Sequence, residues 1–329
     1  MISSQDQLIA PQRAEPRVAT RWPAVGLLAA IDWRIAPPFG GEGERLTQQI
    51  SRMGAYIRTQ ARAALDAAGV PAAPHILCST MLSRVVVDVP ERAALLLRAA
   101  AVSEAATPLA LLSIYECAGW GYAIRFFEDF MTGPHLLVSI ADADFHDLNK
   151  NLEDVRIGRL GFGLTTLLLS VSPRQGAAAE PAGPFPDGGL REFMRALRTR
   201  SESVDGPTFI PFLKPELREL AERLVGRHQL SPNLHDAYGH CFGSDPWIGI
   251  MDWVAESALQ APRDVLAGTI AINGYYAVCR VGVTPDTWFE RRDLTAASAL
   301  RPDEIMARLP ALRRRAGGLT VEDLARGGA

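Results

Sequence analysis

The sequence predicts a protein of the α/β class, and three observations lead to this prediction. The chain has 329 residues, which suits one large domain or two of about 150 residues. Its 48% hydrophobic and 22% charged residues are close to the average for a globular protein. Short apolar runs that favour strands alternate with segments of helical periodicity. This alternation is typical of a layered arrangement of sheets and helices.

The first half of the chain carries the clearer pattern. The expected strands are 24–36, 75–79, 109–115, 136–141 and 161–171, and the expected helices are 44–69, 91–101 and 118–131. Gly69 supplies a stop signal for the first of these helices. We therefore expect a complete α/β half over residues 21–172, after a polar leader at 1–20.

The second half repeats the theme less clearly. Residues 173–189 are rich in Pro, Gly and Ala and predict a surface linker. A second half over 190–283 is expected to contain a strand at 209–213, helices at 216–225 and 246–259, and a pair of strands within 268–283. From residue 284 to 329 the chain is a charged tail with a helical pattern.

Composition and charge exclude several classes of function. The charge sum of 34 − 37 = −3 gives no electrostatic footprint for nucleic acid. No stretch approaches the roughly 20 apolar residues that span a bilayer, and the first twenty residues lack the apolar core of a secretory signal. The four cysteines are spread out without a CxxC pair, so neither a metal site nor a disulfide framework is indicated. We expect a cytoplasmic protein.

Cys117 is the strongest candidate for chemistry. It follows the apolar run LALLSIYE and precedes a helix that begins with Ala118 and Gly119, so it lies at a strand–nucleophile–helix elbow. Backbone N–H groups and the positive end of a helix dipole stabilise a thiolate there. The same N–H groups, including that of Cys117, could hold an oxyanion. The alternative is a buried structural thiol, which is common for a free cysteine.

Around Cys117 the sequence resembles the β-ketoacyl synthase III family of thiolase-fold condensing enzymes. The segment ECAGWGYAIRFFEDFMTGPHLLVSIAD is similar to the active-site region of that family. GFGLTTLLLSV and YGHCFGSDPWIGI follow in the order that the family shows. The resemblance covers about residues 24–283. It implies a thiolase-like fold of two pseudo-duplicated βαβαβ halves in a layered α-β-α-β-α arrangement, with Cys117 as the nucleophile.

The departures from the family bear on the activity. Phe212 stands where the family has a catalytic histidine, and His240 replaces the asparagine of the Gly-Asn-Thr-Ser turn. A Cys117–His240 dyad would remain, in which the imidazole takes the thiol proton. Gly274 is expected by resemblance to supply a backbone N–H to the oxyanion hole. Because Phe212 cannot donate a hydrogen bond, decarboxylative condensation should suffer.

The resemblance therefore implies an acyltransferase. It would load an acyl group from an acyl-carrier protein or coenzyme A thioester onto Cys117. It would then pass the group to a second substrate, by C–C condensation or heteroatom acylation. Secondary metabolism is the expected setting, and polyketide or fatty acid biosynthesis is the expected class of pathway. The acyl thioester is a substrate, and no separate cofactor is expected. Expected partners are the carrier protein and a second copy of the chain, or another ketosynthase in a heterodimer. The alternative function is a non-catalytic ketosynthase-like partner subunit of a heterodimeric condensing enzyme.

Overall fold

A computed structural model gives the fold of the chain. It describes residues 23–41, 43–82, 86–103, 107–145, 153–154, 157–172, 178–257 and 259–316. The polar leader expected over 1–20 lies outside the described residues.

The helices are α1 (Leu46–Ala68), α2 (Pro90–Ala100), α3 (Gly119–Phe130), α4 (Gly189–Ser201), α5 (Pro215–Ala221), α6 (His235–Tyr238), α7 (Asp245–Ser257) and α8 (Pro302–Arg308). The strands are β1 (Val25–Ile35), β2 (His75–Cys78), β3 (Ala110–Leu112), β4 (His135–Asp142), β5 (Glu153–Asp154), β6 (Gly158–Arg159), β7 (Phe162–Val171), β8 (Ala179–Ala182), β9 (Thr208–Phe209), β10 (Arg263–Ile270), β11 (Tyr276–Leu294) and β12 (Leu312–Arg315).

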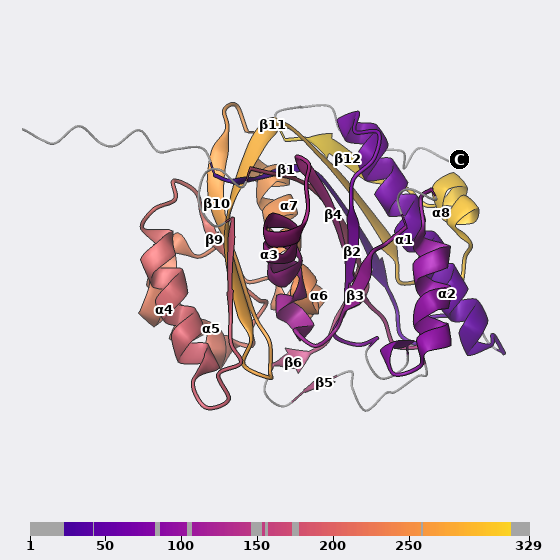
Figure 1. Cartoon of the computed structure of the whole chain (residues 1–329). Coiled ribbons are helices and arrows are strands. Elements are labelled where there is room, and N and C mark those ends of the chain that lie inside the picture. Colours follow the sequence, from indigo (N-terminus) through magenta and orange to yellow (C-terminus); the bar gives the residue numbers. More distant parts are fainter. Residues whose placement is uncertain are drawn as a thin grey trace, which may run out of the picture.

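The elements form five layers, as the sequence predicts (Figure 1). Helices α3 and α7 lie at the centre, between the strands of the two halves. Helices α1, α2 and α8 cover the outer face of the first half, and α4 and α5 cover the outer face of the second (Figure 1). Separate buried apolar clusters fill the central space and the two outer spaces. Burial of these apolar surfaces is the main force that holds the layers together.

The strand order supports the expected duplication. In the first half the order is β3-β2-β4-β7-β1, and β7 runs antiparallel to both of its neighbours. In the second half the order is β9-β10-β11-β8, and β11 runs antiparallel to β10 and β8. The second order repeats the first except at its edge. Among the residues that the structure describes, no strand of the second half takes the place that β3 has in the first.

One long strand joins the two halves. The first part of β11 pairs with β10 and β8, and its last part pairs in parallel with β1 through Leu294↔Ile35. The expectation that the tail from 284 is helical is therefore wrong at its start, where β11 continues to Leu294, and the tail adds β12 after the short α8. The linker expected over 173–189 contains β8. Both differences arise because pairing with a distant strand, which no local pattern reports, extends these segments.

Some further boundaries differ from the expected ones. The strand expected over 209–213 is limited to Thr208–Phe209, and helix α4 was not anticipated. The strand expected over 109–115 ends at Leu112. No helix of the described residues is long and apolar enough to cross a membrane.

Candidate active site

The elbow that carries Cys117 is a short turn between β3 and α3. A single 3₁₀ turn, Glu116–Ala118, leads directly into α3. Glu116 has a backbone φ of +46°, in the left-handed region that few non-glycine residues adopt. Such a conformation costs on the order of 1 kcal/mol or more and is typical of functional sites. The turn explains why the strand stops early, because the chain bends here to present Cys117.

The Cys117 side chain is 4% exposed and lies between two polar groups. Its Sγ is 3.8 Å from His240 Nε2 and 3.8 Å from Thr80 Oγ1. The structure thus brings together the two residues of the expected dyad, which are far apart in the sequence. The catalytic roles of both residues remain predictions at this point.

The backbone of His240 is held by the segment that leads into β7. Its N–H donates to the Arg159 carbonyl at 2.7 Å, and its carbonyl accepts from the Gly161 N–H at 2.9 Å. Gly239, with φ +73°, permits the close approach, because a Cβ there would lie 2.8 Å from the Arg159 oxygen. These contacts fix the backbone of His240 next to the turn that carries Cys117.

A third residue, Asp245, completes the arrangement. It is the first residue of α7 and is fully buried. His240 Nδ1 lies 2.6 Å from Asp245 Oδ2. The same carboxylate accepts hydrogen bonds from the Cys241 N–H at 2.6 Å and from the Phe212 N–H at 2.9 Å. Cys117, His240 and Asp245 therefore form a line of thiol, imidazole and carboxylate, which is the arrangement of a catalytic triad.

Asp245 was not anticipated from the sequence. A usable signal exists, because an acidic residue at the start of an expected helix is favoured by the helix dipole and its free N–H groups. Its position in GHCFGSDPW, five residues after His240, gives no indication that the two side chains meet. The sharp turn at Phe242, with φ +56°, brings them together.

The electrostatics of the site follow from burial and from the carboxylate. Burial alone would lower the pKa of His240, but Asp245 outweighs it, and the pKa lies well above the ordinary value of 6.5. Burial raises the pKa of the Cys117 thiol, and its contact with His240 partly offsets this effect. Asp245 thus favours the charged form of the imidazole, and a charged imidazole in contact with Cys117 stabilises its thiolate.

Phe212 does not bring a polar side chain to the site. Its ring is buried in a small apolar cluster with Cys241 and Ile248 and lies against the ring of Tyr238. Its backbone N–H nevertheless holds Asp245. The residue at the family's histidine position thus contributes through the main chain.

Gly274 lies in the tight turn between β10 and β11, with φ +86°. Its N–H donates to the Ala271 carbonyl at 3.0 Å, so this donor is engaged within the turn. The neighbouring Asn273 donates from Nδ2 to the Ile114 carbonyl at 2.9 Å and ties the turn to the segment before Cys117. The oxyanion roles expected for Gly274 and for the Cys117 N–H remain predictions.

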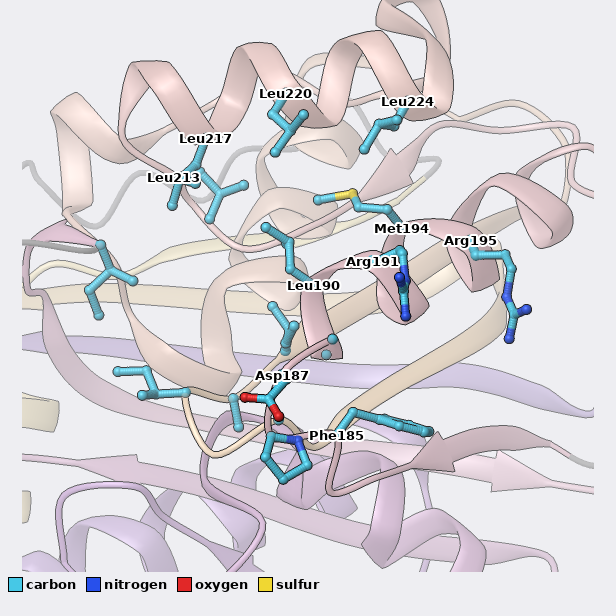
Figure 2. A pocket seen from close by; sticks show the side chains of 18 of the residues that line it. Phe185, Asp187, Leu190, Arg191, Met194, Arg195, Leu213, Leu217, Leu220 and Leu224 are labelled. Carbon is cyan, nitrogen blue, oxygen red and sulfur yellow. The ribbon is translucent and has the colours of Figure 1, made fainter.

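A cavity of about 760 Å³ reaches this turn from the outer side of the second half (Figure 2). Leu213, Leu217, Leu220 and Leu224 point from α5 and its flanking residues toward Leu190 and Met194 (Figure 2). Arg191, Arg195 and Arg198 of α4 also line it and are exposed, and Gly274 is a further lining residue. The cavity thus combines an apolar interior with a basic rim.

Within the described part of the chain, no three or more His, Cys, Asp or Glu side chains are grouped so that they could hold a metal ion.

Comparison with known proteins identifies solved structures with a similar fold. No family model and no curated protein matches the sequence. The acyltransferase ChlB3 has a similar structure, with a TM-score of 0.58 at 12% identity over 78% of this chain and 97% of that one. The 3-oxoacyl-[acyl-carrier-protein] synthase III of Aquifex aeolicus VF5 gives 0.52 at 14% identity, over 78% and 99%. AbyA1, a tetronic acid condensing enzyme, gives 0.51 at 15%, over 78% and 99%.

Identities this low show a shared fold. The alternation, the layers and the strand order of each half agree with that fold. The chain therefore has the thiolase-like α/β fold that the ketosynthase III-type condensing enzymes share.

Proposed function

We propose that the chain is an acyltransferase that carries an acyl group on Cys117. The observation that supports this most is the line from Cys117 Sγ through His240 to Asp245, at 3.8 and 2.6 Å. An acyl thioester of a carrier protein or coenzyme A would be attacked by the Cys117 thiolate. The new C–S bond forms, the carrier thiolate leaves, and the imidazolium of His240 supplies its proton. A second substrate then takes the acyl group, and the proton returns to the site.

The second step is better suited to a heteroatom acceptor than to condensation. Decarboxylative condensation needs polar groups to hold an enolate oxygen, and the Phe212 side chain lies in an apolar cluster. Acylation of an oxygen, nitrogen or sulfur nucleophile needs one base, which His240 supplies after the carrier has left. We propose that such an acceptor in secondary metabolism receives the group.

The cavity near Gly274 supports an acyl-carrier protein as the donor. Its apolar interior suits a long flexible thioester arm, and the exposed Arg191, Arg195 and Arg198 suit an acidic partner surface. The acyl thioester is the substrate in this proposal, and no separate cofactor takes part.

We also propose a homodimer that forms at the free edge of the first half. Strand β3 ends the sheet there. Leu109 and Ile114, which flank it, are 57% and 66% exposed, and Phe130 of α3 is 75% exposed. Exposed apolar side chains beside a strand at the edge of a sheet favour association. Sedimentation analysis would distinguish a dimer from a monomer or a mixed complex.

The test of the function is intact-protein mass spectrometry after incubation with a panel of acyl thioesters. We expect a mass increase equal to one acyl group, and its loss in Cys117→Ala. A chain that stays unmodified with every donor, while its thiol still reacts with iodoacetamide, is incompatible with the proposal.

The alternative of a non-catalytic partner subunit is favoured by one observation, namely Phe212 in place of the family's histidine. Such a subunit would co-purify with an active ketosynthase and would contribute no acyl-enzyme of its own. Retention of the Cys117–His240–Asp245 line argues against it, because a structural subunit has no need of that geometry.

A further inference from the structure

Acyl transfer to Cys117 needs a hydrogen-bond donor for the oxyanion that forms on the acyl carbon. Preorganised donors of this kind are often the largest single contribution to catalysis. The donors expected from the resemblance are the backbone N–H groups of Cys117 and Gly274, and the Gly274 N–H donates to the Ala271 carbonyl. The Phe212 side chain adds no donor, because its ring lies in an apolar cluster.

Thr80 offers a hydroxyl at the required place. It lies two residues after the end of β2, and its Oγ1 is 3.8 Å from Cys117 Sγ. The oxygen of an acyl group on Sγ is two bonds from the sulfur. A hydroxyl in contact with Sγ is therefore within hydrogen-bond reach of this oxygen.

A buried carboxylate holds the backbone of Thr80 in place. Asp142, at the end of β4, accepts hydrogen bonds at Oδ1 from the Thr80 N–H at 2.7 Å, the Met81 N–H at 2.9 Å and the Ser79 hydroxyl at 3.0 Å. Ser79 Oγ in turn accepts from the Leu82 N–H at 2.9 Å. The turn is thus fixed before any substrate binds, which is the condition for electrostatic preorganisation.

We infer that Thr80 is a further catalytic residue, whose hydroxyl donates a hydrogen bond to the oxyanion formed on Cys117, and that Asp142 positions it. The inference rests on the proposed acyl transfer. As the C–S bond forms, the carbonyl π pair moves to the oxygen and Thr80 stabilises the charge. When the pair returns, the carrier thiolate leaves with the proton of His240. Thr80 keeps its own proton throughout.

Two probes separate this role from an effect on the thiol itself. Acetylation by the acetyl thioester of N-acetylcysteamine develops an oxyanion, whereas alkylation by iodoacetamide does not. Both products on Cys117 are measured by mass spectrometry. We expect Thr80→Val to slow acetylation on the order of a hundredfold and to change alkylation by less than about threefold. Thr80→Ser should restore most of the acetylation rate. Thr59→Val, on α1, is the matched control and should leave both rates unchanged.

Asp142 acts through Thr80, so the two substitutions should not add. Asp142→Asn should lower the ratio of acetylation to alkylation in the wild-type background and have little further effect on it in Thr80→Val. Circular dichroism and thermal unfolding establish that each variant is folded, and the serine variant tests the role where valine disturbs packing.

The two probes distinguish a failure of the role inferred for Thr80 from a failure of the proposed acyl transfer. If the wild type is acetylated and Thr80→Val is acetylated equally fast, the role of Thr80 is wrong and the acyltransferase proposal stands. If Thr80→Val slows both probes equally, the hydroxyl acts on the thiol and the inference is also wrong. If wild-type Cys117 is alkylated and never acetylated, both proposals fail together.

Discussion

The two central helices, α3 and α7, begin side by side and contribute different chemistry. A Cβ on Gly243, just before α7, would lie 2.8 Å from the Cys117 carbonyl, just before α3. Trp120 and Trp247, near the two helix starts, meet edge to face with ring centroids 5.1 Å apart. In the proposed function, the start of α3 carries the nucleophile Cys117, and the start of α7 carries Asp245, the acid that orients the base His240. The duplicated fold thus brings two helix N-termini to one point and gives each a separate role.

The two halves also differ in the surroundings of a buried aspartate, which is Asp142 in the first half and Asp245 in the second. In the second half, Asp245 faces His240 and two main-chain N–H groups. In the first half, Asp142 faces a turn of its own half, and burial raises its pKa to about 6. In the two proposals above, Asp245 orients the base and Asp142 positions the turn that carries Thr80. The four predictions below test these differences between the two halves and their central helices.

The largest effect is expected for Asp245→Asn. The amide keeps the volume of the side chain but cannot stabilise the imidazolium or fix its tautomer. By analogy with the loss of the aspartate from a triad, we expect acetylation of Cys117 to slow by about 10³–10⁴-fold. Single-turnover mass spectrometry measures the rate, with Thr59→Val as the control. A rate near that of the wild type would show that His240 works without its acid.

Asp142→Asn should change stability with a defined pH dependence. The pKa of Asp142 is raised to about 6 in the folded protein, from an ordinary value of 3.8, because it is buried. The favourable contribution of its protonation is therefore complete below about pH 4 and is lost as the pH rises through 6. The free energy of unfolding of the wild type, relative to Asp142→Asn, should fall by about 2–3 kcal/mol from pH 4 to 7.5. Urea denaturation measures it, and parallel pH curves for the two proteins contradict the assignment.

Alanine substitutions in the two central helices should differ in cost. A Cβ at Gly121 of α3 would lie 2.2 Å from the Ala277 Cβ, which cannot move without its strand. A Cβ at Gly249 of α7 would lie 2.8 Å from the edge of the Phe209 ring, which can tilt. Both alanines gain about 1 kcal/mol of helix propensity, and overpacking costs about 1–3 kcal/mol. The free energy of unfolding, measured by urea denaturation, should be about 1–2 kcal/mol lower for Gly121→Ala than for Gly249→Ala. Equal values would mean that the surroundings of the two helices adapt equally well to an added methyl group.

The smallest effect is expected for His240→Gln on the thiol alone. The imidazole lowers the pKa of Cys117, so its loss should raise that pKa further. At pH 7.5 alkylation of Cys117 by iodoacetamide should therefore slow, because a smaller fraction of the thiol is ionised. Cys78, whose pKa is raised by burial and by Asp142, is the internal comparison. An unchanged rate at Cys117 would show that His240 does not influence the reactivity of this thiol.

The first half could largely be predicted from the sequence because its signals are local. Strands β1, β2, β4 and β7 and helices α1 and α3 follow apolar periodicity and a glycine stop signal. The elbow at Cys117 was visible for the same reason, since an apolar strand, a cysteine and small residues are adjacent in the chain. The meeting of Cys117 with His240 came from the resemblance, which places two distant motifs in one site.

The rest of the site depends on contacts that no local pattern reports. Asp245 accepts a hydrogen bond from the N–H of Phe212, 33 residues away. It also forms an ion pair with His240 across the turn at Phe242. Thr80 faces Cys117 only because Asp142 of a third segment fixes its turn. The strands β8 and the end of β11 likewise form by pairing with distant partners. Long-range pairing and side-chain hydrogen bonds are set by the tertiary structure, and propensity alone does not show them.

The anchoring of Asp245 by two amide protons has an evolutionary consequence. Every residue except proline supplies that proton, so positions 212 and 241 can drift in sequence without releasing the carboxylate. A lineage that exchanged a histidine for phenylalanine at such a position would forfeit one reaction and still inherit an oriented base. Saturation mutagenesis at either position should accordingly single out proline.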